Sequence, residues 1–363
     1  MRRHHPALRP LTVSLVCLPI VWAAAARAVV LTPDQGSGEQ VPAGQRPPDG
    51  VVARWSGSAT AVAIAPNYVI TTNHQGGGVG TSVYIHGVRY TVSAWFRDGT
   101  SDFKVAHITR DGVPAGLTDY VDIYPSLNEV GKTALLGGYG DSRGAILTSG
   151  GQPYAYKWDG AVGNTVLRWG RNVIDGSGVG YGGGWTSQVL KTDFDDVGTG
   201  GYVSWEAATA DHDSGSGWFI NSAGKWYLAA LTRSTEHIGS TWFANYGNPA
   251  NPDPEQMDAV RLAWYKDWIN YILHDIQPGD ANLDGTVGIA DLATLANNYG
   301  KPSGANWNEG DFNHDNAVGI ADLVVLADNY GANGSPVPAP EPTTAVLLAP
   351  AAVALLRRRR NTR

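Results

Sequence analysis

Short apolar or alternating segments, separated by turn residues, fill the chain between Val51 and about Arg233. Gly, Asn or Asp stands between most of these segments, as is typical of short strands joined by tight turns. Spacing of this kind predicts an all-β sandwich or barrel. The predicted strands are Ala59–Ala65, Tyr68–Thr72, Ser82–Tyr84, Tyr90–Phe96, Val105–Ile108, Thr133–Leu136 and Trp226–Leu231.

The pattern becomes helical over Glu255–Leu273. Apolar residues recur there every three or four positions, which places them on one face of a helix. These residues are Met257, Val260, Trp264, Trp268 and Ile272. Pro278 and Gly279 then interrupt the chain, and we place a domain boundary between residues 275 and 276.

Composition favours the same fold class. The chain has 363 residues, including 46 Gly and 13 Trp, and only 16% of its residues are charged. Abundant Gly and aromatic residues favour β structure over a helical bundle. The formal net charge is −7, whereas a protein that binds nucleic acid carries a basic patch, so no nucleic-acid partner is expected.

Residues 1–28 are typical of a secretory signal peptide. Arg2 and Arg3 precede an apolar run, and Ala26-Arg27-Ala28 is a small-x-small cleavage site. Cleavage after Ala28 would make the protein secreted or associated with the cell envelope. The single cysteine, Cys17, lies inside this signal, so no disulfide is expected in the mature chain. Residues 29–50, rich in Pro and Gly, are predicted to be irregular.

Three segments carry residues for nucleophilic catalysis, in the order His, Asp, Ser. His74 ends a predicted strand, Asp102 precedes one, and Ser214 lies in a Gly-rich turn. A serine hydroxyl is a weak nucleophile, so an imidazole must take its proton and later give it to the leaving group. A carboxylate holds that imidazole in the right tautomer and stabilises its charged form.

From about Val51 to Leu273 the chain resembles the trypsin-like serine protease family. The matching motifs are Asn67-Tyr-Val-Ile-Thr-Thr-Asn-His74, Ser101-Asp102-Phe103, Asp213-Ser214-Gly215 and the closing helix around Tyr265-Lys-Asp-Trp268-Ile. The resemblance implies a chymotrypsin-like double β-barrel with a C-terminal helix over residues 51–275. It also implies a serine endopeptidase that acts on protein or peptide substrates through an acyl-enzyme and needs no cofactor for catalysis.

The turn before the nucleophile departs from the family pattern. The family has Gly two residues before the serine, and its amide helps to form the oxyanion hole. His212 stands there in this chain, so the predicted oxyanion hole consists of the amides of His212 and Ser214. In zymogen members a freed N-terminus reaches the Asp before the nucleophile. Val29 lies far upstream of the first strand, so another partner is expected for Asp213.

By the same resemblance, the base of the primary substrate pocket falls near Ala208, and its wall runs from Thr232 to Ser234. No acidic residue stands at the base, so a small or apolar substrate side chain is expected. Two alternatives remain. Gly140-Asp-Ser142-Arg-Gly144 fits the nucleophile elbow of α/β-hydrolases, although no helical pattern follows it and we interpret residues 137–144 as a loop. The second alternative is a catalytically degenerate, protease-like binding domain displayed at the cell envelope.

An internal repeat follows the boundary, over residues 276–333. Asp280-Ala-Asn-Leu-Asp-Gly-Thr-Val-Gly-Ile-Ala-Asp291 recurs with the same spacing from Asp311 to Asp322. Oxygen ligands at loop positions 1, 3, 5, 7 and 12 suit calcium. The predicted ligands are Asp280, Asn282, Asp284, the Thr286 carbonyl and Asp291 in the first loop, and Asp311, Asn313, Asp315, the Ala317 carbonyl and Asp322 in the second.

This repeat, with Asp at position 12, resembles the dockerin family. The resemblance implies a module that holds two calcium ions and takes a cohesin domain as partner, with the repeated Ile-Ala before Asp291 and Asp322 as the recognition pair. A purely structural calcium module is the alternative. Residues 334–363 resemble a PEP-CTERM sorting tail: a Pro-Glu-Pro motif, an apolar run and terminal arginines. A sorting peptidase is therefore an expected partner for the tail.

Overall fold

The structure is a computed structural model that describes residues 29–32, 40–57, 59–160, 165–243 and 255–333. The predicted signal peptide and the predicted sorting tail lie outside these residues. Among the helices that the structure describes, none is long and apolar enough to cross a membrane.

The first barrel is a six-stranded sheet closed on itself. Its strands follow the order β4-β3-β2-β5-β6-β7, and β4 also pairs with β7, while β8 extends the β7 edge. Every residue of β3 is buried, as expected of a strand enclosed on both faces. The strands are β2 (Val52–Trp55), β3 (Ala59–Ala65), β4 (Tyr68–Thr71), β5 (Ser82–Ile85), β6 (Val88–Phe96), β7 (Lys104–Arg110) and β8 (Val113–Pro114).

The second barrel is a curled sheet with the strand order β13-β10-β17-β18-β20-β15-β14, and β9 pairs with β18. The sheet curls far enough to bring β13 next to β15, where the side-chain amide of Asn172 in β13 donates to the Asp193 carbonyl at 2.6 Å. The strands are β9 (Asp122–Ile123), β10 (Thr133–Gly138), β13 (Arg168–Val173), β14 (Gly176–Gly182), β15 (Trp185–Asp193), β17 (Gly217–Ser222), β18 (Lys225–Thr235) and β20 (Gln256–Arg261).

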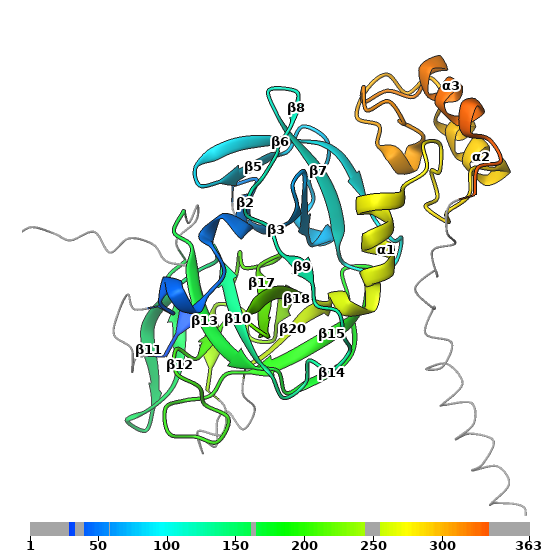
Figure 1. The fold of residues 1–363 in the computed structure, drawn as a ribbon. Helices are drawn as coiled ribbons and strands as arrows, with labels where there is room; N and C mark the ends of the chain where they lie inside the picture. The colour runs from blue at the N-terminus through cyan, green and yellow to red at the C-terminus, as the bar shows by residue number, and fades with distance from the viewer. Residues whose placement is uncertain (1–28, 33–39, 58, 161–164, 244–254, 334–363) are drawn as a thin grey trace, which may run out of the picture.

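Two smaller sheets flank the second barrel. One pairs β1 with β16, and the other has the order β11-β12-β19. Figure 1 shows the β11–β12 hairpin extending away from the barrels. The strands are β1 (Val30–Leu31), β16 (Ala207–Ala208), β11 (Arg143–Ser149), β12 (Gln152–Trp158) and β19 (Ser240–Trp242).

The predicted fold class is confirmed: the chain is mostly β and contains a closed six-stranded barrel together with further sheets. Each predicted strand lies within, or overlaps, an observed one. The predicted helix over Glu255–Leu273 is wrong in its first part. Residues Gln256–Arg261 form β20 because the sheet needs a strand between β15 and β18, and that pairing overrides the helical spacing.

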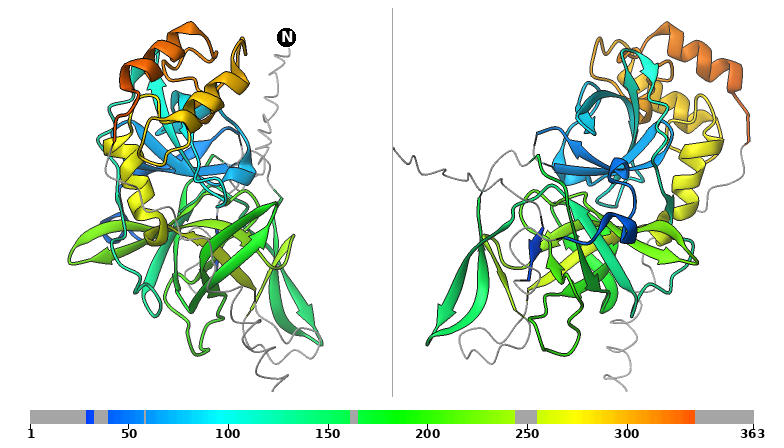
Figure 2. Two further views of the ribbon diagram at one scale, coloured as in Figure 1. Left: turned by 90° about the vertical axis from the view of Figure 1, so that its right-hand side faces the viewer. Right: turned by 60° about the vertical axis from the view of Figure 1, so that its left-hand side comes forward.

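Helical structure begins only after β20. A 3₁₀ turn at Leu262–Tyr265 leads into α1 (Lys266–Asn270) and a π-helical turn at Tyr271–Asp275. Beyond it, α2 (Ile289–Asn298) and α3 (Ile320–Asn329) form the module that carries the repeat. Figures 1 and 2 show this module beside the first barrel. The ring of Trp307 lies 5.8 Å from that of Phe96 in β6, so the module and the barrel share apolar contacts.

Candidate active site

His74, Asp102 and Ser214 come together between the two barrels. His74 lies in a 3₁₀ turn after β4, Asp102 directly precedes β7, and Ser214 lies in the turn before β17. The His74 Nδ1 atom is 2.7 Å from the Asp102 Oδ2 atom, and its Nε2 atom is 2.8 Å from the Ser214 Oγ atom. The His74 backbone N–H also donates to Asp102 Oδ1, at 2.9 Å. This is the connectivity that a serine nucleophile needs.

Hydrogen bonds hold Asp102 in place from both sides. The Asn73 side-chain amide donates to the carbonyls of Ser101 and Phe103, at 2.8 and 2.7 Å, and so spans the aspartate. The Asp102 N–H donates to the Ser187 hydroxyl at 2.9 Å. Asn73 occupies a position where the resembling family has alanine, and the sequence offered no indication of this role.

The turn that carries Ser214 is held by hydrogen bonds to both barrels. The Thr60 N–H in β3 donates to the Ser214 carbonyl at 3.1 Å, and the Gly215 N–H donates to the Thr232 carbonyl at 2.9 Å. Gly215 has φ +80°, and a Cβ there would lie 2.1 Å from the Thr60 carbonyl oxygen. Only glycine fits this close approach.

Asp213 has a partner that the sequence analysis did not expect. Its fully buried carboxylate accepts from Gly140 N–H at 2.8 Å, from Ala210 N–H at 3.0 Å and from the backbone N–H of Val29. Val30 pairs with Ala208, so the predicted irregular segment begins in fact with strand β1. The expected other partners of Asp213 are present in Gly140 and Ala210, and the short β1–β16 pairing adds the backbone N–H of Val29. Burial raises the pKa of Asp213 to about 7 despite these donors.

The expected oxyanion donors lie in an unusual turn. His212 adopts φ +69°, a left-handed conformation that side chains other than Gly, Asn and Asp seldom adopt. Its backbone N–H donates to Oδ1 of the neighbouring Asp211 at 3.0 Å. A substrate oxygen at this amide would therefore have to displace a carboxylate.

The residues of the predicted substrate pocket differ in exposure. Ala208 and Thr232 are 0% and 2% exposed, whereas Ser234 is exposed. Met257 in β20 is 0% exposed and packs in the same apolar cluster as Ala208, and the Thr209 N–H lies 3.0 Å from its sulfur. The helical spacing predicted Met257 on a helix, whereas this residue lies in β20.

The alternative nucleophile Ser142 has no catalytic surroundings. Its hydroxyl donates to the Asp159 carboxylate, and its N–H bonds to the same group at 3.2 Å. Strand β11 follows it, whereas a nucleophile elbow requires a helix. Residues 137–144, predicted to be a loop, are loop only in their middle, since β10 and β11 cover the two ends.

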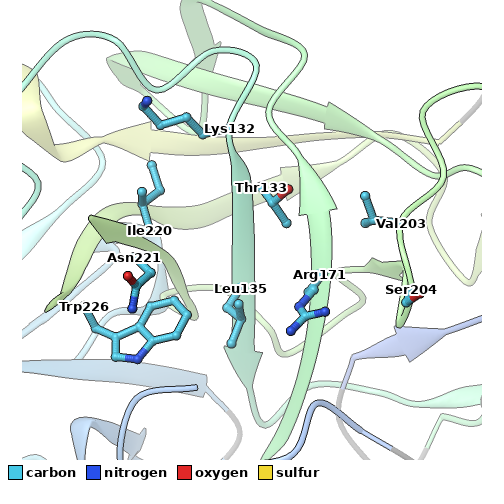
Figure 3. Close-up of a pocket in the computed structure, with 9 residues that line it drawn as sticks. All are labelled: Lys132, Thr133, Leu135, Arg171, Val203, Ser204, Ile220, Asn221 and Trp226. Atoms are coloured by element: carbon cyan, nitrogen blue, oxygen red, sulfur yellow. The ribbon is translucent and has the colours of Figure 1, made fainter. Parts of the chain in front are cut away.

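A separate hollow of about 630 Å³ lies on the second barrel (Figure 3). It is lined by Lys132, Thr133, Leu135, Arg171, Val203, Ser204, Ile220, Asn221 and Trp226. Of the residues that line it, none is His74, Asp102 or Ser214, so it is distinct from the place where these three meet.

The two repeat loops have the same hydrogen-bond pattern. In the first loop the Asp280 carboxylate accepts from the N–H groups of Asp284 and Gly285, at 3.2 and 2.9 Å. Asp311 in the second loop accepts likewise from Asp315 and Asn316, at 3.2 and 3.0 Å. Burial raises the pKa of Asp280, and it raises that of Asp311 to about 6.

The position-12 aspartates complete each loop in the same way. Asp291 accepts from Ala281 N–H at 2.9 Å, and Asp322 accepts from Phe312 N–H at 2.8 Å. The oxygen-rich donor set therefore fits a hard cation. Over the described residues, however, no three His, Cys, Asp or Glu side chains already surround one ion position. The carboxylates instead accept hydrogen bonds from the loop amides.

The first loop is connected to the helical segment that follows the second barrel. The Tyr271 hydroxyl donates to the Asp280 carboxylate, and Trp307 Nε1–H donates to the Asp280 carbonyl at 2.6 Å. The first predicted calcium ligand is therefore held by a residue of the π-helical turn that follows α1.

No protein-family model matches the chain, and no curated protein matches it. Solved structures do match. One, described as the crystal structure of the Rv3671c protease in an inactive form, is 14% identical with a TM-score of 0.36. The match covers 59% of this chain and 84% of that one.

Proposed function

We propose that the protein is a serine endopeptidase that hydrolyses peptide bonds through Ser214, His74 and Asp102. One observation carries this proposal: the continuous chain of contacts from Asp102 Oδ2 to His74 Nδ1, at 2.7 Å, and from His74 Nε2 to Ser214 Oγ, at 2.8 Å. The order of the three residues along the sequence adds support.

Each residue has a role that follows from its contacts. His74 Nε2 takes the proton of Ser214 Oγ as this oxygen attacks the substrate carbonyl, and later delivers it to the leaving amine. Asp102 accepts the Nδ1–H hydrogen bond and stabilises the imidazolium. The Ser214 N–H, and the His212 N–H once Asp211 is displaced, would stabilise the oxyanion. Water then releases the acyl group from Ser214.

The test is labelling of the full chain with a fluorophosphonate, followed by mapping of the labelled residue. We expect the label on Ser214, and we expect Ser214→Ala to lower peptidase or esterase turnover about a millionfold. Ser142→Ala is the matched control, since its hydroxyl is bonded to Asp159. Activity retained in Ser214→Ala but lost in Ser142→Ala would overturn the proposal.

A catalytically degenerate binding domain is the second candidate, and the His212–Asp211 contact favours it. A donor engaged by a carboxylate is not free for an oxyanion, and losing one such donor costs about 10²–10³ in turnover. A domain of this kind would bind peptides without reacting with the fluorophosphonate. The same labelling experiment therefore separates the two candidates.

We also propose that residues 276–333 hold two calcium ions. Support comes from the matching loops and from the oxygen-rich donor set, in which burial raises the pKa of Asp280 and Asp311. Ile289 and Ile320 are 72% and 66% exposed, so the repeated Ile-Ala pairs lie open to a cohesin-like partner. Export by the signal peptide and processing of the tail by a sorting peptidase complete the proposal, and they rest on the sequence alone.

A further inference from the structure

A buried arginine stands behind the catalytic aspartate. The Arg233 Nε atom lies 3.8 Å from Asp102 Oδ2, and the two side chains are 6% and 3% exposed. That nitrogen makes no hydrogen bond. At this distance, in a buried setting, the positive charge acts on the carboxylate with little screening by solvent.

The fold provides for this arginine in two ways. Thr232 pairs with Ala259 and Ser234 with Asp258, which leaves Arg233 as the extra residue of a β-bulge. Bulges redirect side chains and are common next to active sites. On the facing strand, a Cβ at Gly180 or Gly182 would lie 2.9 Å from the guanidinium nitrogens, so glycine at both positions leaves room for them.

Asp258 balances the charge of the arginine. Arg233 Nη1 donates to both oxygens of Asp258, at 3.0 and 2.8 Å, and the Ser234 hydroxyl donates to the same carboxylate at 2.8 Å. Asp102 and Asp258 thus lie on two sides of one guanidinium. Because a buried charge is costly without a partner, the three groups depend on one another.

We propose that Arg233 is a positioning residue of the triad: it holds Asp102 in its ionised form, facing His74, and limits how strongly that carboxylate stabilises the protonated imidazole. This rests on the proposed function for the identity of the triad. A cation beside a carboxylate favours its charged form and weakens its pull on a second proton. Removal of the arginine would then leave Asp102 free to stabilise the protonated imidazole more strongly.

Three other titratable groups lie near Asp102 and have their own partners. Lys104 in β7 donates to the carbonyls of Gly76 and Gly77; burial lowers its pKa to about 8, while Asp102 acts in the opposite direction. Asp98 accepts from Ser101, and burial raises its pKa. The Tyr265 hydroxyl accepts from Gln188 N–H. Arg233 is the arginine whose side chain contacts the Asp102 carboxylate.

The experiment substitutes each end of the ion pair and follows the titration of His74 by NMR, together with the pH dependence of fluorophosphonate reaction. Arg233→Met leaves Asp102 and Asp258 without their cation, so we expect the titration midpoint of His74 to rise by about one pH unit. Asp258→Asn leaves the positive charge of Arg233 without its second carboxylate, so we expect the midpoint to fall. Arg233→Lys keeps the positive charge, and its midpoint should stay within about 0.3 pH units of wild type.

Opposite shifts of the His74 titration midpoint in Arg233→Met and Asp258→Asn would establish the role. A contact that is only structural would change the protein yield or the melting temperature and leave this midpoint unchanged. Shifts in the same direction, or no shift in either variant, would overturn it. If Arg233→Met does not fold, the double variant Arg233→Met/Asp258→Leu removes both charges, and a smaller rise is expected. Arg171→Met is the matched control, because Arg171 contacts Gln45 and Trp205.

The NMR titration of His74 tests the role of Arg233 independently of the proposed endopeptidase activity. If no variant or wild-type sample reacts with the fluorophosphonate, the endopeptidase assignment fails, while the His74 midpoints still decide the role of Arg233. If labelling occurs on Ser214 and the midpoints do not move, the assignment stands and the positioning role is refuted.

Discussion

The two walls of the proposed active site are built differently. The first barrel supplies His74 and Asp102, which bond to each other, and Asp102 lies between hydrogen bonds made by the Asn73 amide and the Ser187 hydroxyl. The second barrel supplies Ser214, in a turn with a left-handed His212 and a buried Asp213. The first wall has these hydrogen bonds in place, whereas we expect the second to depend on groups that processing or substrate supplies.

This difference shows where the activity is decided. The residues that transfer the proton can be in place while the oxyanion hole is not. Most of the stabilisation of the transition state comes from the oxyanion hole. Changes to the second wall should therefore alter turnover and specificity. Changes at the edge of the first barrel should alter stability.

The largest effect is expected at Val29. A chain that begins at Val29 carries a free α-amino group, ordinarily with a pKa of about 8, where the continuous chain has only an amide next to Asp213. The ammonium would pair with the buried carboxylate and fix the turn that carries the oxyanion donors. We expect the Val29 form to exceed a chain that retains residues before Val29 by about 10²–10³ in kcat/KM.

The pH dependence sharpens this prediction. Asp213 raises the pKa of an amine beside it, so the contribution of the ammonium is fully present below about pH 8 and is lost as pH rises through the raised value. The chain that retains residues before Val29 should not show this loss of activity at high pH. Asp213→Asn in the Val29 form is the control and should bring its activity down to that of the extended form. Equal kcat/KM in the two forms would refute the prediction.

The sequence predicted the first wall better than the second for a physical reason. His74 and Asp102 are chemistry-bearing residues next to strongly patterned strands, and the order of the motif located them. Val29 and Met257 act through pairing between segments far apart in the chain, β1 with β16 and β20 with β18. Local periodicity placed Met257 on a helix, because tertiary strand pairing is not visible in a single segment.

The next largest effect concerns calcium and the first barrel. Each occupied loop should stabilise the folded state by about 2.7 kcal/mol at a calcium concentration one hundred times Kd. Because Trp307 packs on Phe96 and Tyr271 bonds to Asp280, chelation should also lower the melting temperature of the catalytic domain. Calorimetry of the full chain with calcium or chelator measures this.

Trp307→Ala provides the control for this coupling. We expect calcium still to bind in that variant, while the melting transition of the catalytic domain no longer responds to it. If millimolar calcium moves no transition in the wild-type chain, neither the metal sites nor the coupling is present.

A smaller effect is expected at Met257, which is buried in the same apolar cluster as Ala208 at the predicted base of the pocket. If Met257 limits the depth of this pocket, the enzyme should prefer substrates with Gly or Ala before the scissile bond. Met257→Ala should open the space and shift preference toward larger apolar residues by about 10–200-fold. It should also cost about 2–5 kcal/mol of stability, because it leaves a cavity. A peptide library profiled with wild type and variant measures the preference. Met257→Leu, which keeps the volume, should retain the wild-type profile.

The smallest effect is expected at His212, although this residue departs most visibly from the family pattern. At φ +69° its backbone already adopts a conformation that glycine reaches freely, so His212→Gly leaves the amide in place and relieves about 1–2 kcal/mol of local strain. The N–H still meets the Asp211 carboxylate until substrate displaces it. We therefore expect turnover to change less than tenfold.

Asp211→Asn separates the two features of this turn, because it removes the charge beside the amide and keeps the size of the side chain. A modest gain in Asp211→Asn with little change in His212→Gly would mean that the carboxylate, and not the backbone, limits the oxyanion hole. A rise of a hundredfold or more in His212→Gly would mean that the wild-type hole is malformed. In that case the second wall would be a degenerate binding surface, although His74 and Asp102 on the first wall are correctly placed for proton transfer.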